Sequence, residues 1–551
     1  MAPALARIQQ QLTEAIPTTT ATQRPKVLAY LDDTYLLVPT THVPTALNIV
    51  QQNMQQLGLN LNDSKTALAT RGPHHPNYTA HYKDNLHVMG VSHNTLQNLH
   101  DDLPDDTHPP GTALDPEAGD DVLLEAQRRL LRALARLHQK ELLRPSTTMT
   151  LIRNFHNNVP VHRIRAAPLS DHVAKQWDNN LYTAISTFLD TANTPTLQAL
   201  IHLPQNLGGF GIHDIDTRRH AALLTAWRQT ARTAHEDLCA STEHDWTLNN
   251  PTTRQHILHA AATLQPLTKL PLDVDWTHWI GTPPKHTQKQ IMQDVYEHVH
   301  TEVLTTLTPT HQAVTRSAGG KGAAAWMYPP ADATTHMPRK HYLTALRYRA
   351  HAPITYTRTS NLCQHTNSTR TCLHPLDAQG HHALTCQIGG QPTLKHNHLR
   401  DILHTWLVKW GYFSQREQRV PELDDTDEKG NPRHARLDIY TTINDRQYLI
   451  DISVTDAVSD CPVRTNSRSS TNATAAMERE QQKRARYQND PRLVPFVFEV
   501  GGRWGPTAEA WIKSVAPTDL AERTRDLTHL RYELSTSLQR SNADMIITAH
   551  H

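Results

Sequence analysis

The sequence predicts an α/β and α multidomain protein, in which helical regions separate two short sheets. Three observations lead to this prediction. The 551 residues leave room for several domains, each with its own core. Runs of β-branched and aromatic residues occur near residues 30 and 445, whereas the middle of the chain has helical periodicity. Three cysteines and several histidines crowd together between residues 363 and 386, which predicts a small metal-bound segment.

The composition excludes several functional classes. The 54 Lys and Arg nearly balance the 53 Asp and Glu, so a basic surface for nucleic acid requires a local asymmetry of charge. The five cysteines do not form a disulfide framework, which favours a reducing compartment. No apolar run has the length of a membrane span, and the N-terminus lacks a signal-peptide core. We therefore expect a soluble intracellular protein without a membrane partner, of unknown oligomeric state.

The segment from Lys26 to Val38, KVLAYLDDTYLLV, predicts a β-hairpin with Asp32 and Asp33 at its tip. Adjacent carboxylates repel each other, and their hard oxygen atoms suit Mg²⁺ or Mn²⁺. The pair therefore predicts a metal site that aligns an attacking hydroxyl with a phosphate. A solvated turn is the alternative, because Asp is common in turns.

An apolar helical stripe follows this hairpin and consists of Val43, Leu47, Val50, Met54 and Leu57. Gly58 is expected to close the helix. The string GLNLNDSKT, which contains Lys65, comes next, followed by a predicted strand through Leu86, Val88, Met89 and Gly90.

This order of elements resembles the palm of reverse transcriptases. Tyr30-Leu31-Asp32-Asp33 stands in the place of the family's aromatic-x-Asp-Asp motif, and the string from Gly58 to Thr66 in that of the next palm motif. The resemblance implies that Asp32 and Asp33 are catalytic metal ligands. It also implies a third aspartate on an earlier palm strand, for which the sequence before Tyr30 is too short. We therefore expect no polymerase activity from this chain alone.

The middle of the chain predicts mostly helices. Residues 101–121 are rich in Pro, Asp, Gly and Thr and predict a linker, whereas 122–143, 174–189, 218–234 and 288–307 predict helices. The string LPQNLGGFGI from Leu203 to Ile212 contains three glycines that allow close backbone approach or positive φ. It resembles a string that follows the palm and thumb in non-LTR retrotransposon polyproteins. An ordinary loop is the alternative.

The crowded Cys/His region predicts a structural zinc site. Cys363, Cys372, His382 and Cys386 offer three thiolates and an imidazole, and the last two are four residues apart, on one face of a helical turn. Nearby histidines are competing ligands, namely His374, His381 and His396. The region also resembles the CCHC segment that precedes the endonuclease in site-specific non-LTR elements.

Further along, residues 436–440 and 448–454 predict two strands joined by a turn at Asn444 and Asp445. If the strands pair, Asp438 and Asp451 converge and hold a metal ion that activates water against a phosphodiester. A structural α/β sandwich with acids on its turns is the alternative. Strand 493–500 is expected to complete the sheet.

These two acids resemble the PD-(D/E)xK nuclease core, and in particular the restriction-like endonuclease of the same retrotransposons. Leu437 replaces the family's proline, and Ser453 stands where its lysine usually follows. The composition from Ala475 to Tyr487 predicts a helix. The resemblance allows a lysine from this next helix, which implies Lys483, where it stabilises negative charge on the phosphate. Glu417, expected at the end of a helix that includes Trp406, is an additional acid.

Together the segments resemble the C-terminal part of a non-LTR retrotransposon polyprotein. The expected domains are a partial palm (1–100), a helical thumb and connector (101–315), a linker with the CCHC segment (316–398), a restriction-like endonuclease (399–515) and a helical tail (516–551). The resemblance implies Mg²⁺ or Mn²⁺ and Zn²⁺ as cofactors, template RNA and target DNA as partners, and a nuclear location if genomic DNA is nicked. A non-catalytic nucleic-acid-binding remnant, and a stand-alone nuclease with a structural N-terminal half, are the alternatives.

Overall fold

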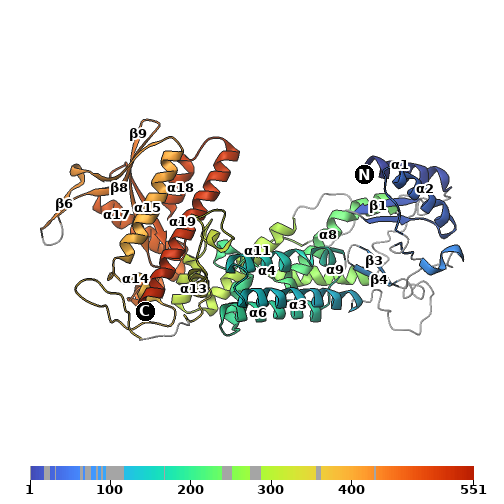
Figure 1. Ribbon diagram of the computed structural model, residues 1–551, viewed down its shortest axis with the longest axis horizontal. Helices are drawn as coiled ribbons and strands as arrows, with labels where there is room; N and C mark the ends of the chain where they lie inside the picture. Colours follow the sequence, from blue (N-terminus) through green and yellow to red (C-terminus); the bar gives the residue numbers. More distant parts are fainter. Residues whose placement is uncertain are drawn as a thin grey trace. The chain divides into compact units, whose positions relative to one another are not determined.

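The computed structural model describes residues 2–17, 25–30, 33–62, 66–68, 76–81, 85–88, 91–94, 117–166, 168–238, 251–272, 287–354, 361–426 and 430–550. The chain forms two compact units (Figure 1). The first unit comprises residues 1–127, 158–178 and 215–295, and the second unit comprises residues 128–157, 179–214 and 296–551. Across the described ranges, none of the helices combines the length and the apolar character that a membrane crossing requires.

The first unit contains the expected hairpin near its N-terminus. Strands β1 (Lys26–Tyr30) and β2 (Asp33–Leu37) pair antiparallel, with Tyr30 opposite Asp33. Helices α1 (Ala2–Ala15) and α2 (Val43–Gln55) share an apolar core with this hairpin. The hairpin prediction is therefore confirmed in the backbone, and Val27 and Leu36 pack against the two helices. Asp33 is the first residue of β2 and does not lie at the tip.

Some residues expected in this region differ from the prediction or lie outside the described ranges. Leu57 is 43% exposed and follows α2 instead of completing its buried stripe, because the chain turns at Gly58 with φ +74°. Asp32 and Lys65 lie outside the described residues, and the Asp33 side chain is not described. Of the strand expected from Leu86 to Gly90, the structure describes β3 (Asn85–Val88), which pairs antiparallel with β4 (Val91–Asn94). Met89 and Gly90 lie outside the described residues.

Long helices make up most of the middle of the chain. They are α3 (Glu117–Gln139), α4 (Pro145–Asn158), α5 (Val161–Ala166), α6 (Asp171–Leu189), α7 (Pro195–His202), α8 (Ile215–Leu238), α9 (Pro251–Leu264), α11 (Gln288–Thr306), α12 (Pro309–Ser317) and α13 (Arg339–Arg349). Residues 101–116 of the predicted linker lie outside the described ranges. The prediction is wrong for residues 117–121, because α3 already begins at Glu117.

Short helical turns connect these elements. They are η2 (Thr40–His42), η3 (Pro76–His81), η5 (Gln205–Leu207), η6 (Gln265–Leu267), η7 (Ala325–Met327), η8 (Pro421–Leu423) and the short helix α14 (His381–Thr385).

The glycine string lies in the core of the second unit. A Cβ on Gly209 would clash with the backbone carbonyl of Leu203, and Gly208 has φ +95°. Arg349 is buried, and its guanidinium donates hydrogen bonds to the carbonyl oxygens of Gln205, Gly209 and Ala318. The string is therefore a tightly packed structural loop, because neither a larger residue nor a free carbonyl fits there.

The C-terminal part of the second unit is built around a four-stranded sheet. Its strands lie in the order β10 (Leu493–Glu499), β9 (Arg446–Thr455), β8 (Arg436–Ile443) and β5 (Phe413–Arg419). Strands β9 and β10 are parallel, and the other pairs are antiparallel. The β8–β9 turn has positive φ at Asn444 and Asp445, as such a two-residue hairpin turn requires. A small hairpin of β6 (Asp425–Thr426) and β7 (Pro432–Arg433) lies between β5 and β8 in the chain.

Helices pack against this sheet in two separate apolar clusters. Helices α15 (Gln391–Lys409), α18 (Pro506–Val515) and α19 (Leu520–Ala549) share one cluster with Ile450 and Ile452 of β9. Tyr487, which follows α17 (Thr474–Arg486), shares the other cluster with Leu449. Helix α16 (Pro462–Ser470) packs against α17 and α12. Because successive residues of β9 point to opposite faces, Asp451 lies on the same face as Leu449.

Glu417 corrects one prediction about the local structure. It lies on strand β5 and not at the end of a helix, because α15 ends at Lys409 and the chain reverses at Gly411, with φ +82°. Glu417 itself has φ +59°, a strained value for a residue with a side chain.

Candidate functional site

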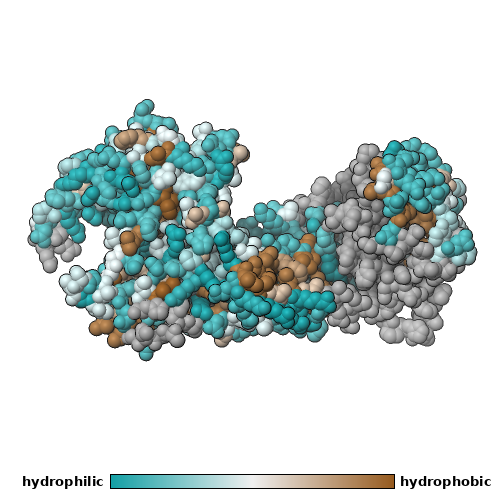
Figure 2. All heavy atoms as spheres, viewed as in Figure 1, coloured by the Kyte–Doolittle hydropathy of each residue, from teal (hydrophilic) through white to brown (hydrophobic). Residues whose placement is uncertain are grey.

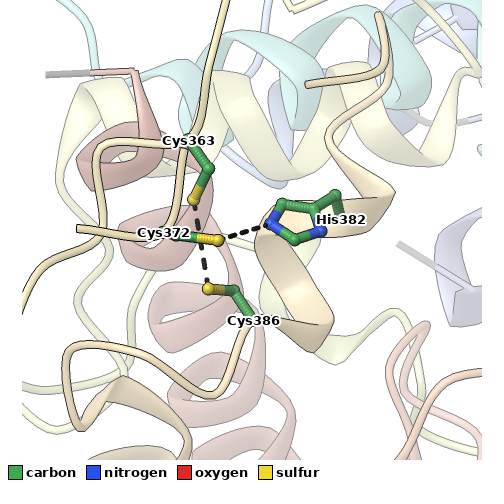
Figure 3. Close-up of side chains that lie close together, drawn as sticks. All are labelled: Cys363, Cys372, His382 and Cys386. Carbon is green, nitrogen blue, oxygen red and sulfur yellow. Dashed lines mark hydrogen bonds between the residues drawn. The ribbon is translucent and has the colours of Figure 1, made fainter. Parts of the chain in front are cut away.

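Three cysteines and one histidine come together in the second unit. One ligand atom from each of Cys363, Cys372, His382 and Cys386 lies within 4.8 Å of the others (Figure 3). The Sγ atoms of Cys363 and Cys386 are 4.0 Å apart, and the Sγ of Cys372 lies 3.3 Å from Nε2 of His382. The structure therefore brings together all four residues that the sequence singled out.

The local sequence explains why His382 and Cys386 face the other two cysteines. The carboxylate of Asp377 accepts hydrogen bonds from the backbone N–H groups of His381 and His382, and so caps the first turn of α14. Gly380 precedes this helix with φ +84°. One turn then places His382 and Cys386 on the same side of the chain.

The buried thiols of this cluster resist deprotonation. Burial raises the pKa of Cys363 to about 12 and also raises the pKa of Cys386. Their conversion to thiolates therefore requires a compensating positive charge, which a metal ion would supply. A set of three sulfur atoms and one nitrogen could hold a metal ion of the softer, tetrahedral kind.

The three competing histidines have other roles. The His374 ring stacks on His382, with centroids 4.1 Å apart. Tyr348 lies within hydrogen-bonding distance of His381, at 3.4 Å, and His396 contacts Asp438. None of these three belongs to the group of four whose ligand atoms converge.

A second group of polar residues gathers on the sheet around Asp438 and Asp451. Asp438 accepts a hydrogen bond from the backbone N–H of Ile452 at 2.6 Å, which joins it to the strand that carries Asp451. Its other oxygen lies 2.8 Å from Nε2 of His396 on α15. The carboxylates thus lie on neighbouring strands β8 and β9, as the sequence predicted.

Helix α17 brings two side chains to Asp451. The Nζ atom of Lys483 lies 2.5 Å from Oδ2 of Asp451, and the Tyr487 hydroxyl donates a hydrogen bond to Oδ1 at 3.2 Å. Lys483 and Tyr487 are four residues apart, so one face of the helix end carries both. All three side chains are buried.

The electrostatics of this group depend on its burial. Burial raises the pKa of Asp451, and the nearby negative charge of Asp438 adds to this effect, whereas Lys483 opposes it. The hydrogen bond to Asp438 raises the pKa of His396. Asp451 is therefore a carboxylate that needs a neighbouring cation to remain ionised, either the ammonium of Lys483 or a metal ion.

Glu417 does not join the two aspartates in a common ligand set. Its carboxylate pairs with Arg400 of α15 and with Arg436 of β8. Among the described residues, no group of three or more ligands within 4.8 Å includes Asp438, Asp451 or Glu417.

Two contacts of this site were not predicted from the sequence. His396 was considered only as a competing zinc ligand, although the structure places it against Asp438. Tyr487 was recognised only as part of a helix. Its position four residues after Lys483 was the signal that could have found it.

Comparisons with known proteins give no further guidance for this site. No protein-family model matches the chain, and no curated protein matches it.

Proposed function

We propose that this chain is a C-terminal fragment of a non-LTR retrotransposon reverse transcriptase and endonuclease, whose C-terminal part nicks target DNA by metal-dependent phosphodiester hydrolysis. The observation that carries the proposal is the contact of Lys483 with Asp451, beside Asp438 on the next strand. Two carboxylates and one ammonium from three separate elements are the groups that this chemistry needs.

Each residue has a distinct role in the proposed reaction. Mg²⁺ or Mn²⁺, when bound, would supply an activated water and a positive charge next to the phosphate. Asp438 and Asp451 would hold the ion, and Lys483 would stabilise the negative charge that builds up on the phosphate. His396 and Tyr487 are positioning residues, because His396 contacts the carboxylate of Asp438 and Tyr487 contacts that of Asp451.

The Cys/His cluster is proposed to hold zinc in a structural role. Cys363, Ala383 and Cys386 pack in one apolar cluster with Ile546 and Ala549 of α19. Nε2 of His365 lies 2.8 Å from the carbonyl of Met545. Zinc would therefore fasten this segment to the last turns of α19, the helix that also packs on α15 and the sheet.

A separate proposal concerns the N-terminal region. Asp32 and Asp33 are proposed as remnants of the polymerase site, and the polymerase part is proposed to be inactive alone. Template RNA and target DNA are the proposed partners, in the nucleus if the substrate is genomic. A non-catalytic nucleic-acid-binding remnant is the competing proposal, because the same ion pair could simply stabilise the sheet.

The test is a nicking assay with the full chain on supercoiled plasmid. Addition of Mg²⁺ or Mn²⁺ to zinc-loaded protein that is free of both ions should convert the plasmid to open circles. Ca²⁺ should support DNA binding but a slower rate of nicking. Zinc must be retained during preparation, so that loss of structure is not mistaken for loss of chemistry. Absence of nicking with every divalent ion and with both plasmid and linear DNA would favour the remnant.

A further inference from the structure

A cavity of about 430 Å³ lies among helices α3, α4 and α6 of the second unit. Its apolar lining includes Leu131, Leu134, Ile152 and Phe188. Figure 2 shows hydrophobic residues next to hydrophilic ones in the part of the view where Figure 1 draws α3 and α4. The volume falls in the range of cavities that accept a small ligand or one large planar group.

A row of cations follows the same helix past the cavity. Arg128, Arg132, Arg136 and Lys140 are four residues apart, so they lie on one face, about 6 Å apart along the axis. Arg128 and Arg132 line the cavity, and the last three cations are exposed. The sequence from Ala126 to Lys140 contains no acid. This is the local asymmetry of charge that a nearly neutral chain needs to attract a polyanion.

His138 adds an unsatisfied polar group to the lining. Only 9% of this residue is exposed, and Arg339 donates a hydrogen bond to its Nε2 at 2.9 Å. Burial and the charge of Arg339 lower the pKa of His138 to about 4, so the ring is neutral at pH 7 and carries its proton on Nδ1. Nδ1 is buried and has no hydrogen-bond partner in the described part of the chain.

We propose that this face binds single-stranded nucleic acid, with phosphates along the cation row and one unpaired base in the cavity. A periodic row of cations beside an apolar cavity matches the way such strands are bound, through the backbone and through the faces of the bases. A duplex could use the cations but not the cavity, because its bases are paired and stacked. The carboxylates of an acidic peptide could pair with the cations, but they offer no flat ring to fill the apolar cavity.

The proposal goes beyond the nuclease and does not depend on it. The cavity lining and the cation row lie between residues 128 and 188, and neither they nor Arg339 belong to the group around Asp451. Binding can be measured without divalent metal, when no cleavage occurs. The two proposals can therefore fail separately.

The test compares two exposed alanines of α3. Ala135 lines the cavity, whereas Ala133 does not. In Ala135→Trp the new side chain should fill the cavity and weaken binding of a fluorescent oligo(U) RNA about tenfold, the value of one stacked base. Ala133→Trp should change the Kd less than about twofold. Oligo(dT) DNA measured in parallel tells whether the strand is RNA or DNA.

Salt dependence tests the cation row. The double variant Arg132→Ala/Arg136→Ala should reduce the slope of log Kd against log salt by about 1.4, because each single-strand phosphate contact contributes about 0.7. Arg254→Ala on α9, also exposed, should leave the slope unchanged. Equal affinities of the two tryptophan variants, tighter binding of a duplex, or binding of poly-glutamate in preference to RNA would each overturn the proposal. Circular dichroism verifies that every variant is folded.

Discussion

Lys483 and Asp451 form a buried ion pair between helix α17 and strand β9, with 2.5 Å between Nζ and Oδ2. Such a pair is a poor source of stability, because two charges must leave water to form it. The burial of this pair therefore favours a role in chemistry over a role in stability.

Lys483→Met should destabilise the chain by about 3 kcal/mol in metal-free buffer, because Asp451 remains buried without its counter-charge. The double variant Asp451→Asn/Lys483→Met should lose less stability than Lys483→Met, because it leaves no unpaired charge in the buried site. Urea unfolding of both single variants and the double variant gives the coupling energy. The control is Lys513→Met, which removes the half-exposed pair with Glu509 and should change stability by less than about 1 kcal/mol. Additive effects in the cycle would contradict the prediction.

The Cys/His cluster should hold about one zinc ion per chain. Cys386→Ser should lose the metal and loosen the last turns of α19, because Cys386 and Ile546 share one apolar cluster. Elemental analysis measures the first effect and hydrogen exchange the second. Cys461→Ser is the matched control, since that cysteine is exposed and outside the cluster. His374→Ala should also keep the metal, because His374 stacks on His382 but is not one of the four residues whose ligand atoms converge. Unchanged zinc in Cys386→Ser would refute the assignment.

Stability at acidic pH should depend on His138. Its folded-state pKa of about 4 lies below the ordinary value of 6.5, so folding favours the neutral ring. The contribution is fully present above pH 6.5 and is lost as the pH falls toward 4, because the unfolded chain takes up the proton first.

His138→Gln should therefore flatten the pH dependence of the free energy of unfolding between pH 6.5 and 4. The largest possible difference in slope is about 1.4 kcal/mol per pH unit, the value for one proton. Exposed His172 on α6 provides the control His172→Gln. Parallel curves for the wild type and His138→Gln would show that the ring titrates equally in both states.

The glycine string should tolerate no side chain at Gly209. Gly209→Ala should destabilise the chain by roughly 3 kcal/mol or more, because the new Cβ would clash with the carbonyl of Leu203 in a buried loop. Gly411→Ala is the control. Gly411 has φ +82° but open space around it, so only the backbone strain of about 1 kcal/mol should appear. Thermal unfolding measures the loss of stability in each variant. Equal losses of stability in both would mean that the clash at Gly209 is not the cause.

The helices and strands were predicted best where a regular pattern of apolar residues extends over many positions. The strands that carry Asp438 and Asp451 and the helix that carries Lys483 follow from apolar alternation and helical composition alone. The four Cys/His ligands were also identified, because cysteines are rare in this chain. Each of these signals depends on residues that are close together in the sequence, so a single sequence is enough to detect it.

The sequence could not predict contacts that depend on how helices and strands pack against one another. His396 is one of 38 histidines, and its contact with Asp438 depends on how α15 lies on the sheet. The cavity near Phe188 needs three helices at a fixed spacing. Tertiary packing decides both features, and it also overrides local propensity. The position of Glu417 is different, because Gly411, with φ +82°, was a local signal for the helix end that the prediction did not use.

The nicking rate of Asp451→Asn tests the central claim most directly. This variant keeps the size of the side chain but removes its charge, and Asp460→Asn, at an exposed acid beyond the end of β9, is the matched control. The rate constant is measured under single-turnover conditions on supercoiled plasmid in Mg²⁺, with zinc content and circular dichroism verified for each protein. We predict a fall of about a thousandfold or more for Asp451→Asn and no more than a twofold change for Asp460→Asn, since loss of a metal ligand removes several kcal/mol of transition-state stabilisation. Nicking by Asp451→Asn at the wild-type rate would contradict the account, because the reaction would then take place elsewhere.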